Sequence, residues 1–470
     1  MSGAAESHPF LSGGWTPLGR EIEIAEVPVV QGAVPEALNG TFLRNGPDQQ
    51  FPPLGRYHPF DGDGMLHGFR FEGGRVSYRN RWIRTARFEL EAQHGRALFG
   101  GLAAMNATDP LAAQTSMNPA NINVIRHAGR TLALWEVGLP HEVDPESLET
   151  RGTFDFEGAL FRPMGEARLP GIMTAHPRFD PRSGELVMFG NCPIPPNLLY
   201  HVVDAEGRLT RTEAIELPFP AMIHDFAITE NYAVWPVFPG NYRLERVATH
   251  GSPLVWEPEL GGRFGVLPRD GGSDDVIWLE TDPCYVFHLA NAYEEGDVLV
   301  VDAHPFSRLP EAVEVAATDT ELDPPYLVRF RLDLKSGTVR REQLGEHTSD
   351  FPRINPERAT RKNRHLWALG DVAPGVGDGG FQSILHYDLE RGTEEARLLP
   401  GRDFASEPAF VSTGESEDDG VLLSIVWRAE EDRSELLILD ARDVTGEPVA
   451  TLALPHRIPA GFHGNWLPAE

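Results

Sequence analysis

The sequence predicts an all-β fold: a seven-bladed β-propeller in which loops and short helices cap one face. Short apolar runs recur in pairs from one end of the 470-residue chain to the other, with Gly, Asp, Asn or Ser between the two runs of a pair. Runs of about five to eight residues joined by such turns are typical of antiparallel hairpins. No stretch keeps a helical apolar period over three turns, so long helices are not expected.

The expected hairpins are spread evenly along the chain. They cover residues 67–82, 122–136, 177–190, 200–215, 225–238, 291–303, 328–344, 383–399 and 420–441. At roughly 60–65 residues per blade, seven blades account for the chain as a single domain over 1–470, with an extended N-terminal segment over 1–35. The irregular segments 95–120 and 161–173 are expected to be loops that cap one face.

The composition restricts the partners. With 70 acidic and 41 basic side chains the net charge is -29, which repels phosphate backbones and argues against a nucleic-acid partner. No apolar run approaches the roughly 18–20 residues of a membrane span, although a small apolar patch could make transient membrane contact. Two cysteines, Cys192 and Cys284, provide no disulfide framework, so a soluble protein of the reducing cytoplasm is expected. The sequence does not indicate the oligomeric state.

Four of the 17 histidines stand out because each lies at the start or end of an apolar strand segment. They are His176, His224, His288 and His463. Taken singly, each is more simply a core histidine whose ring nitrogens are hydrogen-bonded. In a propeller, however, the innermost strand of every blade faces the axis, so four such histidines would meet. A zinc site usually draws two or more ligands from one short motif, which this spacing lacks.

Two carboxylates fit the same arrangement. Glu136 in LALWEVG and Glu407 in SEPAFV lie in apolar sequence, where an unpaired carboxylate is costly, and ligating histidines need an acceptor on their second nitrogen. The alternative is a strand-end carboxylate bound to backbone amides or an arginine. The acidic segments 61–64 and 294–297 lack the full ligand set of a calcium loop and are read as turns.

Motifs along nearly the whole chain resemble the carotenoid cleavage oxygenase family, which includes lignostilbene dioxygenases and isoeugenol-type monooxygenases. They run in the family's order from LNGTFLRNGPD and HPFDGDGMLHGFRF, through MTAHPRFDP, MIHDFAIT and FHLANAYEEGD, to DFPRINP, SEPAFV and GFHGNW. The resemblance implies a propeller that carries Fe(II) on His176, His224, His288 and His463, with Glu136, Asp350 and Glu407 as carboxylate partners of the ligands. Relatives usually have Glu at position 350; the shorter Asp350 predicts a histidine held through water or on a shifted strand.

The reaction implied by the resemblance is O2-dependent cleavage of a conjugated C=C bond to give two carbonyl fragments. Four neutral imidazoles would leave two positions on iron free for O2 and a water or substrate. No protein nucleophile is required, because the protein binds and orients a small hydrophobic alkene in a dry tunnel.

The expected substrate pocket departs from that of stilbene-cleaving relatives, which hold the phenolic oxygen with a Tyr and a Lys in the N-terminal third. This chain has no lysine before Lys335, and the matching positions are Leu102 and Met117. Ile122 stands where relatives place Thr; Phe60 and Phe287 complete the expected pocket. An apocarotenoid-like polyene is therefore the leading substrate, with a phenylpropene or stilbenoid as the alternative.

Two other classes of function stay open at the level of sequence. A non-oxidative isomerase or hydrolase exists within the family, and it would form product without consuming O2. A propeller that binds a partner and has lost its metal would have no need of four histidines and their carboxylates. Their persistence favours the enzyme.

Overall fold

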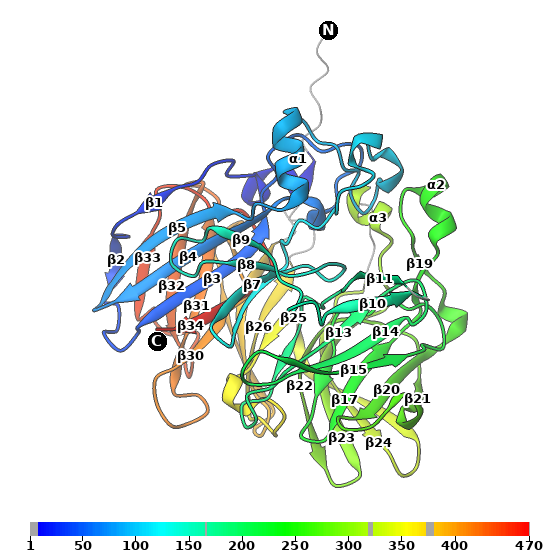
Figure 1. The fold of residues 1–470 in the computed structure, drawn as a ribbon. Helices are drawn as coiled ribbons and strands as arrows, with labels where there is room; N and C mark the ends of the chain where they lie inside the picture. The colour runs from blue at the N-terminus through cyan, green and yellow to red at the C-terminus, as the bar shows by residue number, and fades with distance from the viewer. Residues whose placement is uncertain (1–7, 165–166, 318–322, 373–379, 470) are drawn as a thin grey trace.

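The computed structural model describes residues 8–164, 167–317, 323–372 and 380–469, and these form a propeller of seven antiparallel blades (Figure 1). All of the hairpins expected from the sequence are present as paired strands. The all-β prediction is confirmed.

Each blade has four or five strands, of which the first named lies nearest the axis and the last at the outer edge. Blade 1 contains β34 (Gly464–Pro468), β3 (Gly40–Pro47), β4 (Gly64–Glu72), β5 (Arg75–Trp82) and β1 (Glu23–Ile24). Blade 2 contains β6 (Asn123–His127), β7 (Arg130–Leu134), β8 (His141–Val143) and β9 (Thr150–Thr153). Blade 3 contains β12 (Arg178–Phe179), β13 (Leu186–Asn191), β14 (Leu198–Val203) and β15 (Leu209–Ile215). Blade 4 contains β16 (Ala227–Ile228), β17 (Tyr232–Val237), β20 (Gly262–Pro268) and β21 (Ile277–Thr281).

The last three blades share hydrogen bonds and form one continuous ladder. Blade 5 contains β22 (Tyr285–Glu295), β23 (Val298–Phe306), β24 (Tyr326–Asp333) and the first part of β25 (Thr338–Arg353). Blade 6 contains the end of β25, β26 (His365–Val372), β27 (Phe381–Asp388) and β28 (Thr393–Leu398). Blade 7 contains β30 (Ala409–Ser412), β31 (Gly420–Arg428), β32 (Arg433–Asp440), β33 (Ala450–Ala453) and β2 (Val29–Gly32). The short strand β29 (Phe404–Ala405) bridges β27 and β31.

Strands from the two ends of the chain close the ring. β34 pairs with β3, with Gly464 opposite Arg44, and β2 pairs with β33 at the outer edge of blade 7. In Figure 1 the blue N-terminal strands accordingly lie beside the orange and red C-terminal ones. The segment 1–35, expected to be extended, thus supplies two pairing strands, β1 and β2; its residues 1–7 lie outside the described part of the chain.

The innermost strands surround a common axis. Residues of β6, β12, β16, β22, β25 and β34 line one cavity of about 190 Å³. A side chain just before or at the start of an innermost strand therefore lies close to its counterparts in other blades.

The three α-helices lie beyond one end of the blades, as expected for the cap (Figure 1). The α-helices are α1 (Ala86–His94), α2 (Val247–His250) and α3 (Ala312–Ala317). The 3-10 helices are η1 (Pro9–Leu11), η2 (Gly13–Trp15), η3 (Pro59–Asp61), η4 (Met105–Ala107), η5 (Pro110–Ala112), η6 (Leu244–Arg246), η7 (Pro258–Leu260), η8 (Ser273–Asp275) and η9 (Pro356–Arg358).

The expected loops have more structure than predicted. Segment 95–120 contains η4 and η5, and the Met105 amide donates to the Gly251 carbonyl at 2.8 Å, which joins this segment to α2. Segment 161–173 was wrongly expected to be irregular, because it contains the hairpin of β10 (Phe161–Met164) and β11 (Ala167–Pro170). The Arg168 guanidinium lies 3.6 Å from the Phe161 ring centre across this hairpin, a cation–π contact that the apolar pattern does not reveal. A second short hairpin pairs β18 (Gly240–Tyr242) with β19 (Leu254–Trp256).

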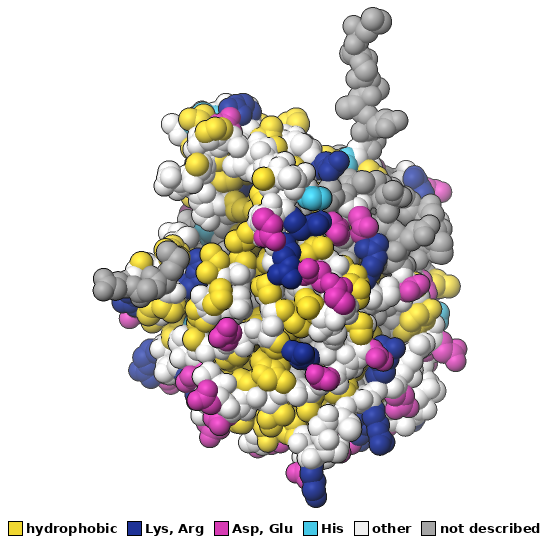
Figure 2. All heavy atoms as spheres, turned by 90° about the vertical axis from the view of Figure 1, so that its right-hand side faces the viewer, with side chains coloured by type: hydrophobic (Ala, Val, Ile, Leu, Met, Phe, Trp, Pro, Cys, Tyr) yellow, Lys and Arg dark blue, Asp and Glu magenta, His cyan; other side chains and the backbone are white. Residues whose placement is uncertain are grey.

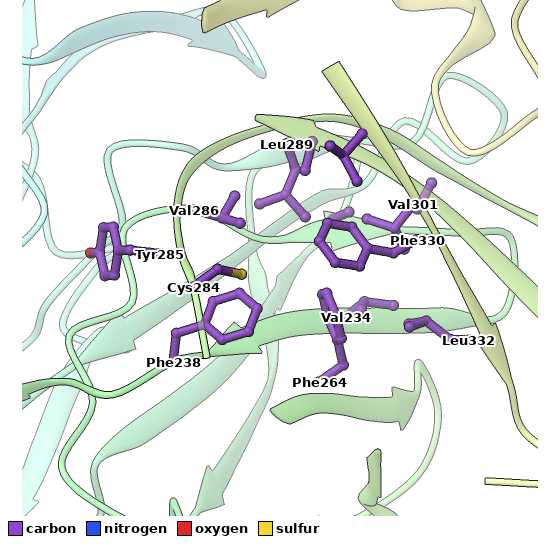
Figure 3. Packing of buried hydrophobic residues seen from close by; sticks show 14 of the residues in the cluster. Val234, Phe238, Phe264, Cys284, Tyr285, Val286, Leu289, Val301, Phe330 and Leu332 are labelled. Carbon is purple, nitrogen blue, oxygen red and sulfur yellow. The ribbon is translucent and has the colours of Figure 1, made fainter. Parts of the chain in front are cut away.

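The largest core cluster packs blade 4 against blade 5. Figure 3 shows Val234 of β17, Phe264 of β20 and Phe330 of β24 pointing toward one another, with Leu289 of β22 above them. Because Leu289 follows His288, this packing holds a candidate metal-ligand strand in place.

The surface shown in Figure 2 mixes acidic and basic side chains rather than separating them, with apolar atoms between. Among the described residues, no helix has the length and apolar character to cross a bilayer.

We expect Phe330→Ala to lower the free energy of unfolding by about 3–5 kcal/mol, the usual cost of such a cavity. Phe330 is fully buried, and its ring lies 5.1 Å from that of Phe264. Urea unfolding measures the change. The control is Leu398→Ala, since Leu398 is 67% exposed and its removal should shift stability by no more than about 0.5 kcal/mol. Equal effects of the two changes would contradict the assigned packing.

Candidate metal centre

Four histidines meet on the propeller axis, each from a different blade. His176, His224 and His463 lie just before β12, β16 and β34, and His288 lies within β22. All four are buried, and one ring nitrogen from each lies within 4.8 Å of the others. The ring centroid of His176 is 4.5 Å from those of both His224 and His463 and 5.3 Å from that of His288.

The arrangement fits one metal ion. The Nε2 atoms of His176 and His224 are 3.0 Å apart, which is the separation of two nitrogens at right angles about 2.1 Å from a single ion. The Nε2 atom of His288 is buried and has no hydrogen-bond partner among the described residues. Unpartnered buried nitrogens are costly, and a shared metal would satisfy them.

Three carboxylates fix the orientation of three histidine rings by hydrogen bonds to their Nδ1 atoms. Glu136 Oε2 lies 2.6 Å from His224 Nδ1, and Glu407 Oε1 lies 3.0 Å from His463 Nδ1. Asp350 Oδ1 lies 2.8 Å from His288 Nδ1. An acceptor on Nδ1 keeps the proton there and leaves Nε2 free as a metal ligand. His176 has no carboxylate of this kind among the described residues.

Asp350 reaches its histidine directly, so no water is needed between them. The β25–β26 pairing is irregular between Asp350 and Arg353, and Phe351 has φ of 54°. The direct contact thus coincides with a local irregularity of the strand that carries Asp350.

Burial and charge set the protonation of the centre. Burial lowers the pKa of His176 well below its usual value, and the neighbouring histidines add to the effect. Burial also lowers the pKa of His463. At His288 burial acts in the same direction, but the Asp350 carboxylate prevails and raises the pKa. A metal ion must displace that proton, so its affinity should fall as the pH falls.

A second, apolar cavity of about 310 Å³ opens on the other side of the histidines. Aromatic rings supply most of its wall, and His224, His288 and His463 form part of it. The aromatic lining residues are Phe10, Trp15, Phe60, Phe287, Phe306, Phe351, Phe381, Phe404, Trp427 and Phe462. An apolar molecule in this space would contact the metal-binding nitrogens directly.

The structure brings three of the five expected pocket residues to this cavity. Phe60, Ile122 and Phe287 line it. Leu102 and Met117 are not among the residues that line it. The Leu102 amide donates to Asp61 at 2.7 Å. The Leu102 side chain packs against the core cluster of blades 4 and 5, and the Met117 side chain packs against the cluster of Leu98, Phe99 and Ala112. Leu102 and Met117 follow a loop whose path the sequence pattern does not determine.

The sequence reasoning missed two groups of residues. Phe10 and Trp15, from the N-terminal segment, form part of the cavity wall. Arg353 forms an ion pair with Glu407 at 3.2 Å; it contributes to the lowered pKa of Glu407 against the opposing effect of burial. The signal for Arg353 was present, since it is a charged residue in the DFPRINP motif, but none existed for Phe10 and Trp15.

Comparisons with known proteins agree on one family. The family model for the retinal pigment epithelial membrane protein, RPE65, matches residues 15–468. The chain is 35% identical to an isoeugenol monooxygenase of Pseudomonas nitroreducens, over 100% of both chains. It is also 35% identical to an apocarotenoid-15,15'-oxygenase of Synechocystis, over 93% of this chain and 92% of the relative.

Solved structures give the same result. A lignostilbene dioxygenase of Pseudomonas brassicacearum is similar with a TM-score of 0.90 and 31% identity, over 100% of both chains. A Synechocystis apocarotenoid oxygenase variant has a TM-score of 0.87 and 32% identity, covering 97% of this chain and 98% of its own.

We expect the loss of a histidine ligand to lower metal affinity more than the loss of one of the carboxylates bonded to the histidines. His176→Ala should abolish tight binding, whereas Glu136→Gln or Glu407→Gln should weaken it roughly 10–100-fold, the usual cost of losing such a partner. Metal titration of the apo-protein measures both.

The matched control for Glu407 is Glu435→Gln. Glu435 is equally buried in the same blade and is paired with Arg428 and Arg433, but lies outside the centre. If Glu407→Gln bound metal as tightly as Glu435→Gln, the carboxylate would serve stability alone.

Proposed function

This chain belongs to the RPE65/carotenoid cleavage oxygenase family and is an alkene-cleaving oxygenase; we propose that its cofactor is one Fe2+ held by His176, His224, His288 and His463. Glu136, Asp350 and Glu407 are proposed to hold those ligands. The observation that carries the proposal is the convergence of four buried imidazoles, three of which line an apolar cavity.

The donor set favours a redox metal of intermediate softness. All four donors are imidazole nitrogens, which suit Fe, Cu, Ni or Zn, and no thiolate or carboxylate is among them. Bound Fe2+ would supply O2 activation beside the substrate double bond. Zinc would fit the same nitrogens but offers no redox chemistry.

The protein's own residues bind and orient the alkene. Stacked and edge-on rings of the cavity exclude water, and Phe60 lies parallel to His224 with ring centroids 6.4 Å apart. Phe287 packs edge-on against the same histidine at 5.4 Å. A flat conjugated molecule between such rings would present its double bond to the histidine side. The carboxylates keep the ring protons of His224, His288 and His463 on Nδ1 and away from the cavity.

The cavity favours a compact aryl alkene, of the phenylpropene or stilbenoid type, over a long apocarotenoid. Its volume of about 310 Å³ is at the lower end of the roughly 300–1,000 Å³ typical of small-molecule sites. Relatives named for isoeugenol and for lignostilbene match the chain over its full length. An apocarotenoid, the leading substrate expected from the sequence, becomes the second candidate. It is supported by the described lining residues, which include neither Tyr nor Lys to hold a phenol.

A reducing compartment such as the cytoplasm is proposed as the site of action. Cys192 and Cys284 are both buried and free, as expected where disulfides do not form.

We expect the aerobically purified protein to contain about one iron per chain, and chelation followed by Fe2+ to restore cleavage. Zn2+ should bind without restoring it, because only a redox metal can use O2 at an all-imidazole site. Metal analysis and an oxygen electrode give the two readouts. Full turnover by zinc-loaded protein, or product without O2 consumption, would point to a non-oxidative reaction.

We expect methylation of a phenolic substrate to leave most of the turnover intact. Apolar burial contributes on the order of 0.8 kcal/mol per CH2, whereas a hydroxyl gains little without a partner. Comparison of kcat/KM for 4-hydroxystilbene, its methyl ether and an apocarotenal tests both this and the size preference.

A loss above roughly a hundredfold on methylation, about 2.7 kcal/mol, would show that a polar group holds the phenol. Arg44 would then be the candidate, since it lines the cavity and its Nε has no hydrogen-bond partner among the described residues.

A further inference from the structure

Two arginines line the cavity of about 190 Å³ between the innermost strands, called the axial cavity below, which lies on the other side of the histidines from the apolar cavity. Arg178 and Arg353 line the axial cavity together with His176, His288 and His463, and neither lines the apolar cavity. Neither can be a metal ligand, because guanidinium has no free lone pair at physiological pH. Their hydrogen bonds give them a different role.

Arg178 connects the innermost strands of blades 3, 4 and 5. Its Nη2 donates to Asp225 Oδ2 at 2.6 Å and to the Leu289 carbonyl at 2.8 Å. The Leu289 amide donates to the same Asp225 oxygen at 2.8 Å. Both backbone groups of Leu289, the residue after His288, are therefore held by one ion pair.

Arg353 repeats this pattern across blades 6, 7 and 1. Its Nη2 contacts Glu407 Oε2 at 3.2 Å and donates to the Gly464 carbonyl. The Gly464 amide donates to the same Glu407 oxygen at 3.2 Å. Gly464 follows His463, so here too the backbone after a histidine is held at both its N–H and its C=O.

The two groups of residues, Arg178–Asp225–Leu289 and Arg353–Glu407–Gly464, have the same kinds of residue in the same order around the ring of blades. In each, an arginine of one blade and a carboxylate of the next blade hold the residue that follows a histidine in the third blade. Stability alone would not require both sets to end at a position adjacent to a histidine. A metal site does, because its ligands must be held within about 0.5 Å of their working positions.

We propose that Arg178 and Arg353 are positioning residues that set the strand positions of His288 and His463 for metal binding. The proposal rests on the metal site of the proposed function. The arginines act through the backbone of Leu289 and Gly464. Asp350 acts on an imidazole ring, and Glu407 acts on both the His463 ring, through Oε1, and the Gly464 amide, through Oε2. Loss of an arginine should therefore displace a ligand while leaving the substrate cavity unchanged.

The test compares Arg178→Gln and Arg353→Gln with Arg329→Gln. Arg329 forms an ion pair with buried Asp302 in blade 5, with two contacts of 2.8 Å, and it lines neither cavity. Anaerobic titration of each apo-protein with Fe2+ should show 10–100-fold weaker binding for the first two variants. Arg329→Gln should lose thermal stability but bind Fe2+ as the unchanged protein does.

Steady-state kinetics at saturating Fe2+ supply a second readout. Arg178→Gln and Arg353→Gln, the axial variants, should have a lower kcat with little change in KM, because the substrate cavity keeps its lining. Unchanged Fe2+ affinity in both axial variants would overturn the proposal. Failure of the unsubstituted protein to bind Fe2+ would instead overturn the proposed function, so the two failures are distinguishable.

Arg178→Lys and Arg353→Lys decide the matter if the Gln variants do not fold. Lysine keeps the charge but lacks the planar fork that reaches two acceptors at once. We expect each Lys variant to keep part of the Fe2+ affinity of the unsubstituted protein. An affinity equal to that of the unsubstituted protein would show that charge alone suffices, and would also overturn the positioning role.

Discussion

The pairing of β34 with β3 is the constraint on which the metal centre depends. It joins the C-terminal strand to the N-terminal third of the chain and so completes blade 1. The same closure fixes His463, whose amide donates to the Ile122 carbonyl and whose carbonyl accepts from the Asn45 amide. Without it, three histidines would face the axis and the fourth ligand would be missing. A closed ring of strands thus replaces the short ligand motif that most metal sites use.

The histidines separate two environments of opposite character. On one side, aromatic rings enclose an apolar space for the alkene. On the other, the axial cavity contains arginines and asparagines whose charges and amides are paired with carboxylates or backbone groups. Charged groups at the centre are therefore held by partners, which avoids the cost of unpaired buried charge. The metal would sit at the boundary, where protein charges hold the ligands and the substrate meets a dry surface.

Reaction and substrate choice depend on different parts of the chain. His288 lies within an innermost strand, and the other three histidines lie just before one, so the regular part of the fold positions all four. The cavity wall draws on connecting segments and the N-terminus, as with Phe10, Trp15 and Phe60, as well as on strands, as with Phe306, Phe381 and Trp427. Loops tolerate change more readily than core strands. Relatives that share the fold are named for isoeugenol, lignostilbene and apocarotenoids, and we expect the wall outside the strands to be where their cavities differ.

The sequence by itself determined the hairpins, the blade number and the four histidines, because alternation along a strand and turn residues are local signals. It also identified Glu136 and Glu407 as carboxylates in apolar sequence, and Asp350 through the family's motifs. Only the tertiary structure decided the hairpin at 161–173, the exclusion of Leu102 and Met117 from the cavity, and the inclusion of Phe10 and Trp15. The backbone links made by Arg178 and Arg353 also required it. These features arise from contacts between residues far apart in the chain, and no local periodicity records which distant segments will meet.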